Sequence, residues 1–204
     1  MKIDFRKKTD TLFLGPGLGS ISAERLEGLI SFHGYLATGA FIGMQMSALG
    51  RRLLGLENGE RIHVVCETIN CLPDPFQYLD GCTVGNKGLI IEDTGKMAVT
   101  ITKHAPPNED APGVRIVLDA NKTKHYPRLH AWYMKTGKLP HDETIETLIE
   151  AGENVYSYER VSVPVPGRIE KMITICSDCG ESFVRNKTNC DYCPDCRKEK
   201  DNVK

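Results

Sequence analysis

Four cysteines near the C-terminal end form the clearest chemical pattern in this sequence. Cys176 and Cys179 form one pair, Cys193 and Cys196 form a second, and the whole motif reads C-x2-C-G-x12-C-x2-C. Two such pairs can surround a tetrahedral metal ion with four thiolates, a ligand set typical of structural zinc. We therefore expect these four cysteines to bind one Zn²⁺ ion in a zinc ribbon.

The ribbon zinc is expected to be structural rather than catalytic. Four protein thiolates fill the tetrahedron and leave no position for a substrate, and a segment of this length buries too little apolar surface to fold without the metal. Cys190 is a surplus thiol. It could take the place of Cys193, but Cys193 and Cys196 form the regular pair.

A second group of potential ligands lies in the first half of the chain. His33 stands in the segment F-H-G-Y, and the segment 67–89 contains Cys71, Asp74, Gln77 and Cys82 between two expected strands. Imidazole and thiolate groups together suit zinc or a similar transition metal, and three protein ligands would leave one position open for water. The blander interpretation is that His33 satisfies a hydrogen bond at a helix end and that Cys82 is buried and inert.

The segment 67–89 resembles the central signature of the FmdE family, which is named for a component of formylmethanofuran dehydrogenase. The matching residues are Glu67, Thr68, Cys71, Asp74, Gln77, Gly81, Cys82, Thr83, Gly85 and Leu89, and Phe32, His33 and Gly34 match the start of its N-terminal signature. The resemblance covers nearly the whole chain, because members of the family often carry a C-terminal zinc ribbon.

The resemblance implies an α+β domain that often forms a homodimer and that has a metal pocket, here His33, Cys71 and Cys82 with Asp74 and Gln77 nearby. It also implies an accessory component of a larger complex in which other proteins carry out the chemistry. The chain departs from the family's H-G-H-x-C-P-G signature, because Tyr35 replaces its second histidine and Ala37 replaces its cysteine.

Three functions follow from these observations. The first is a zinc-binding FmdE-like protein that acts as an accessory or metal-binding component, is homodimeric and has a possible protein partner. The second is a stand-alone metalloenzyme that uses His33, Cys71 and Cys82. The third is a regulator that binds nucleic acid or protein through the ribbon. The sequence does not decide whether the protein is an enzyme, and it names no substrate.

The elements that must position these residues indicate an α+β fold. Apolar periodicity predicts helices after Ser22, over residues 38–54 and over 142–151, and strands over 61–67, 114–118 and 155–165. Residues 89–92 and 97–103 flank a turn and are expected to form a hairpin. We predict a largely antiparallel sheet with packed helices over residues 1–170, followed by a zinc ribbon over 171–204, with the boundary near residues 166–171.

Composition and charge narrow the remaining classes. The 204 residues carry a formal net charge of −1, which weighs against nucleic acid as the partner. No apolar run is long enough to cross a membrane, and no secretory signal begins the sequence. A cytoplasmic protein is the simplest expectation, and its eight cysteines are then reduced and available for metal binding.

Overall fold

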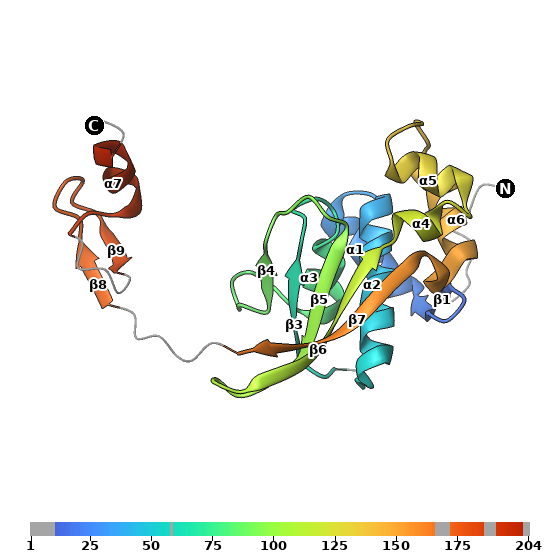
Figure 1. Cartoon of the computed structure of the whole chain (residues 1–204), viewed down its shortest axis with the longest axis horizontal. Helices are drawn as coiled ribbons and strands as arrows, with labels where there is room; N and C mark the ends of the chain where they lie inside the picture. Colours follow the sequence, from blue (N-terminus) through green and yellow to red (C-terminus); the bar gives the residue numbers. More distant parts are fainter. Residues whose placement is uncertain (1–10, 58, 166–171, 186–190, 202–204) are drawn as a thin grey trace. The chain divides into compact units, whose positions relative to one another are not determined.

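The fold is described from a computed structural model, over residues 11–57, 59–165, 172–185 and 191–201. The chain divides into two compact units, Met1–Val165 and Pro166–Lys204, and each is described by itself (Figure 1). The predicted boundary at residues 166–171 lies outside the described residues, as does Cys190.

The larger unit is built on a sheet of five strands in the order β4-β3-β5-β6-β7. The strands are β3 (Ile62–Cys66), β4 (Leu89–Ile91), β5 (Ala98–Lys103), β6 (Asp110–Leu118) and β7 (Tyr156–Pro164). Three of the four pairings are antiparallel, and β3 pairs with β4 in parallel. The predicted α+β class with a largely antiparallel sheet is confirmed.

The predicted hairpin between residues 89–92 and 97–103 is wrong, because β3 lies between β4 and β5. Val64 pairs with Leu89 on one side and with Ile101 on the other. The turn at residues 93–96 instead passes around the end of β3, where the amides of Thr94 and Lys96 both donate to the carbonyl of Glu67, each at 3.1 Å. Short sequence separation therefore gave the wrong partner, since the parallel β3–β4 pair forms through a longer helical connection.

Helices cover one face of the sheet (Figure 1). They are α1 (Ala23–His33), α2 (Thr38–Leu54), α3 (Asp74–Asp80), α4 (Ala120–Thr123), α5 (Pro127–Tyr133) and α6 (His141–Ala151), followed by a 3₁₀ turn, η1 (Gly152–Val155). Before α1, the segment expected to be a loop forms a hairpin of β1 (Thr11–Gly15) and β2 (Gly19–Ser22). The side chain of Ser22 caps α1, as predicted.

Helix α2 is the centre of the core, and its small residues let neighbouring backbone approach closely. A Cβ atom on Gly43 would come within 2.7 Å of the carbonyl oxygen of Leu72, and one on Gly50 would come within 2.3 Å of Ile101 on β5. The small face predicted for this helix therefore packs against the sheet and the β3–α3 connection of its own chain. This was the first of the two arrangements that the sequence left open.

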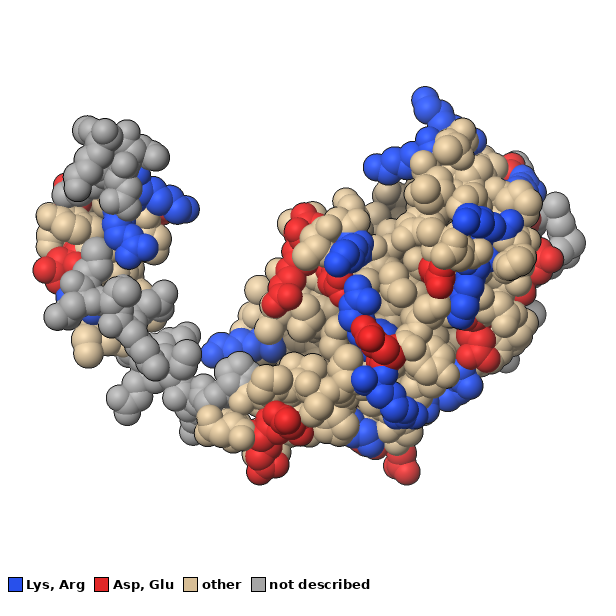
Figure 2. Space-filling model, in the orientation of Figure 1, with Lys and Arg blue, Asp and Glu red and all other residues tan. Residues whose placement is uncertain are grey.

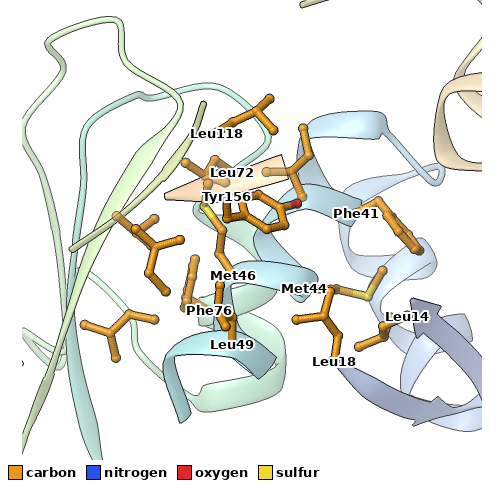
Figure 3. Packing of buried hydrophobic residues seen from close by; sticks show 14 of the residues in the cluster. Leu14, Leu18, Phe41, Met44, Met46, Leu49, Leu72, Phe76, Leu118 and Tyr156 are labelled. Carbon is orange, nitrogen blue, oxygen red and sulfur yellow. The ribbon is translucent and has the colours of Figure 1, made fainter. Parts of the chain in front are cut away.

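One polar network is buried inside this core. The hydroxyl of Tyr156 donates to Oε1 of Gln45 at 2.6 Å, and Nε2 of Gln45 donates to the carbonyls of Leu14 and Leu148 at 2.6 and 2.9 Å. Figure 3 shows Tyr156 among apolar side chains that include Met46 and Leu72. Each polar atom has a partner, so the network joins β7, α2, α6 and β1 without an unsatisfied group.

The sheet face opposite α2 carries an ion-pair group. Arg115 makes two hydrogen bonds to the carboxylate of Glu67, at 2.6 and 2.9 Å, and Glu159 lies 3.8 Å from the same guanidinium. The hydrogen bonds from Arg115 lower the pKa of Glu67. On the face shown in Figure 2, basic and acidic side chains are interspersed over the larger unit, so no surface of one sign dominates that view.

The C-terminal unit contains the hairpin of β8 (Met172–Ile175) and β9 (Ser182–Arg185) and the helix α7 (Pro194–Asp201). Among its described residues, Cys176 alone belongs to the buried apolar class, whereas Met172, Ile173, Ile175 and Val184 are exposed. No helix among the described residues is long and apolar enough to cross a membrane.

Candidate functional site

The four cysteines of the C-terminal unit meet because two turns and one helix start bring their side chains together. Cys176 follows β8, and Gly180 closes the first turn with a φ of +75° and a hydrogen bond from its amide to the carbonyl of Cys176. Cys193 precedes α7, and Cys196 lies in the first turn of that helix. The Sγ atoms of the four cysteines all lie within 4.8 Å of one another.

The distances fit a tetrahedral metal ion. Metal–sulfur bonds of about 2.3 Å place the sulfurs of a tetrahedron about 3.8 Å apart, and the Sγ atoms of Cys179 and Cys193 are 3.9 Å apart. The amide of Cys193 also donates to Sγ of Cys176 at 3.3 Å. This group of four cysteines can therefore hold a metal ion.

The electrostatics of the four thiols agree with this geometry. Backbone amides of Cys193 and Cys179 lower the pKa of the Cys176 thiol to about 6, so this thiol is ionised at neutral pH. Contact with Cys193 raises the pKa of Cys196. Four thiols this close cannot all ionise without a cation among them, because like charges repel.

The second predicted group is divided by the fold. Cys71 precedes the first residue of α3, and Cys82 follows its last turn, so the two thiols lie at opposite ends of a seven-residue helix, which is about 10 Å long. Cys82 is buried, its thiol donates to the carbonyl of Ile62 at 3.3 Å, and burial raises its pKa to about 11. The structure therefore does not bring Cys82 together with Cys71.

His33 lies at the Cys71 end of α3 and has an acidic partner. Its Nδ1 atom is 2.5 Å from Oδ2 of Asp74, and Gln77 donates to the other oxygen of this carboxylate at 3.2 Å. Asp74 also contributes, after burial, to a raised pKa of the Cys71 thiol. His33, Asp74, Gln77 and Cys71 thus gather where α1 ends and α3 begins, as the sequence predicted for the four without Cys82.

The structure adds two residues that the sequence did not identify as part of this site. The ring of Tyr35 lies 5.1 Å from that of His33 and 5.5 Å from that of His141, measured between ring centroids. Nδ1 of His141 accepts from the backbone amide of Thr38 at 3.1 Å. His141 is about a hundred residues away in the chain, so no local pattern linked it to this site. We call His33, Tyr35, Cys71, Asp74, Gln77 and His141 the His33 cluster.

The His33 cluster can do different chemistry from the four cysteines. Because Asp74 holds one ring nitrogen of His33, its Nε2 atom is left to accept a proton or to bind a metal. Among the described residues, however, only the four cysteines form a group of three or more side chains whose ligand atoms are close enough for a metal ion.

Comparisons with known proteins agree with this description. A family model described as "FmdE, Molybdenum formylmethanofuran dehydrogenase operon" matches residues 32–163. A crystal structure of an FmdE-like protein of tungsten formylmethanofuran dehydrogenase, from Syntrophus aciditrophicus, superimposes with a TM-score of 0.73 and 28% identity, covering 94% of this chain and 97% of that one.

A curated relative from Archaeoglobus fulgidus is described as a probable S-adenosyl-L-methionine-binding protein. It is 37% identical to this chain over 101 residues, which are 47% of this chain. The matched segment spans only 26% of that relative, so the similarity concerns one part of a longer protein.

Proposed function

The chain belongs to the FmdE family, and from this membership we propose that it is a zinc-binding accessory component of a system related to formylmethanofuran dehydrogenase. The observation that carries the proposal is the group of four cysteines whose Sγ atoms lie within 4.8 Å of one another. In this role the protein supplies a folded surface to its partner, and the zinc supplies folding free energy to the C-terminal unit.

Zinc is the metal that this ligand set fits best. Four thiolates in a tetrahedron are typical of structural zinc, and the closed set leaves no position for a substrate. The exposed apolar residues of β8 and β9 show how little core surrounds the site. The residues of the ribbon therefore bind and orient the ion, and the amides donated to Cys176 hold its thiolate in place.

A homodimer and a protein partner in a larger complex are part of this proposal. They come from family membership, and they are measured by sedimentation equilibrium of the purified chain and by co-purification from its source. An alternative is a stand-alone metalloenzyme. The observation in its favour is the His33–Asp74 pair, because Asp74 orients His33 as carboxylates orient metal-binding histidines.

Metal content of the full-length chain, purified without an affinity tag, tests both functions. We expect one zinc per chain in the wild type, loss of this zinc in the double variant Cys176→Ser/Cys193→Ser, and full retention in His33→Ala. Cys66→Ala is the matched control, because Cys66 is a fully buried thiol whose pKa burial raises to about 12.

Two results would change the assignment. A second metal per chain that disappears in His33→Ala or Cys71→Ala, with the ribbon zinc retained, supports the metalloenzyme. A wild type without zinc, or a double variant that keeps it, contradicts the assignment of the four cysteines.

A further inference from the structure

A cavity of about 640 Å³ lies in the larger unit, apart from both groups of potential ligands. It is bounded by the β1–β2 hairpin, the start of α1, the second half of α2, the end of α3 and the segment that leads into β3. We propose that it binds a small organic anion, in which an apolar body carries a carboxylate or a phosphate group. This inference does not depend on the proposed metal-binding role.

The floor of the cavity is apolar and already ordered. It is formed by Leu14, Leu18 and Ile21 of the hairpin and Met44 of α2, and all four side chains are buried. Figure 3 shows Leu14 and Leu18 beside Met44. Ligand cavities in proteins are typically about 300–1,000 Å³ and mostly apolar, with a few placed polar groups. The size and the floor therefore fit a metabolite-sized molecule.

The deepest charged pair in the cavity wall is already neutralised. Asp80 accepts from Nε of Arg51 at 2.9 Å and from the hydroxyl of Ser47 at 2.7 Å, and its side chain is only 3% exposed. The remaining nitrogens of Arg51 donate to the carbonyls of Glu57 and Glu60. Asp80 and Arg51 thus cancel each other and form a fixed wall rather than a free binding group.

The other basic groups in the lining have donors to spare. Arg25 uses one Nη atom to donate to the carbonyl of Leu79 at 2.8 Å, and the Arg61 side chain makes no hydrogen bond or ion pair to the described residues. Both are exposed. Glu60 is the remaining acid, and it accepts from the amide of Glu57.

These charges select the sign of the ligand. Three arginines and two acids line the cavity, and the Arg51–Asp80 pair is internally satisfied. Guanidinium groups that retain free N–H donors bind carboxylates and phosphates by charge-assisted hydrogen bonds. An anionic group between Arg25 and Arg61, with an apolar body against Leu18 and Met44, satisfies both parts of the lining.

Fluorescence titration of the full-length chain with 1-anilinonaphthalene-8-sulfonate tests the proposal, because this probe joins an apolar body to one anionic group. N-Phenyl-1-naphthylamine is the matched uncharged probe. We expect saturable binding of the sulfonate to the wild type and a Kd about five- to tenfold higher in Arg25→Gln and in Arg61→Gln. The affinity for the uncharged probe is expected to stay within twofold.

Arg160→Gln is the control for the two arginine variants. Arg160 is also exposed and also donates to one backbone carbonyl, that of Leu53, but it does not line the cavity. Ala48→Phe places bulk in the cavity and is expected to weaken the binding of both probes. If this variant fails to fold, the arginine variants still decide the question.

Three results overturn the proposal. The first is no saturable binding of the sulfonate to the wild type. The second is unchanged affinity in the double variant Arg25→Gln/Arg61→Gln, which places the probe elsewhere on the chain. The third is an equal loss of affinity in Arg160→Gln, which shows a response to overall charge rather than to this cavity.

Discussion

The larger unit buries a continuous apolar cluster between α2 and the sheet, whereas the described part of the C-terminal unit buries Cys176 and leaves the apolar residues of β8 and β9 exposed. The first unit can fold by removing apolar surface from water. The second has four sulfurs where a core would otherwise lie. The difference shows that similar strand patterns can depend on unrelated sources of stability.

The largest expected effect is that of removing the metal from the C-terminal unit. Chelation, or the variant Cys176→Ser, is expected to unfold residues 172–201 while the larger unit keeps its fold, because metal binding supplies the folding free energy of such small units. Backbone amide NMR signals check the ribbon, and fluorescence of Trp132, the sole tryptophan, reports on the larger unit. A lower melting temperature in the Trp132 signal would show that the units are not independent.

The next effect concerns the polar network in the core of the larger unit. Tyr156→Phe removes the donor to Oε1 of Gln45 and leaves that buried oxygen without a partner. We expect a loss of about 1–3 kcal/mol in the free energy of unfolding, measured by urea denaturation followed through Trp132. Tyr158→Phe is the control, because Tyr158 lies two residues along the same strand and is 52% exposed. Equal losses would contradict the role of the network.

A smaller effect is expected where α2 packs closely against the β3–α3 connection. Gly43→Ala places a Cβ atom 2.7 Å from the carbonyl oxygen of Leu72. Overpacking of this kind costs about 1–3 kcal/mol, and the better helix propensity of alanine offsets up to about 1 kcal/mol. Gly85→Ala is the control, because the nearest atom to its added Cβ is 3.9 Å away. A Gly43→Ala protein as stable as the wild type would mean that the connection can shift.

The smallest effect is the pH dependence of the Glu67–Arg115 pair on the sheet. Hydrogen bonds from Arg115 lower the pKa of Glu67 in the folded protein. The pair therefore stabilises the fold above the pKa of an unfolded glutamate, and this contribution is lost as the pH falls through the lower, folded pKa. We expect it to be about 1 kcal/mol or less.

Urea midpoints measured through Trp132 between neutral and acidic pH check this last prediction. The fall in midpoint on acidification should be smaller in Glu67→Gln than in the wild type. Glu150→Gln is the control, because Glu150 is an exposed acid on α6 that makes no hydrogen bond or ion pair to the described residues. If Glu67→Gln and the wild type respond equally to pH, the pair contributes nothing to acid sensitivity.

Features that depend on local spacing could be predicted from the sequence. The C-x2-C pairs, the Ser22 cap, the helix over residues 38–54 and the alternation of Ile62, Val64 and Cys66 are each set by neighbouring residues, whose positions follow from helix and strand periods. The signature residues also sufficed to place the chain in its family. Glu67, one of these signature residues, proves to be an anchor for Arg115 and for the turn around β3.

Which distant residues meet could be learned only from the folded chain. The fold inserts β3 between β4 and β5, places Cys71 and Cys82 at opposite ends of α3, and brings His141 to Tyr35 across about a hundred residues. It also forms the cavity of Arg25 and Arg61 from five separate elements. Such pairings depend on how whole elements bury their apolar faces together, and that choice is made by the complete core rather than by any local pattern.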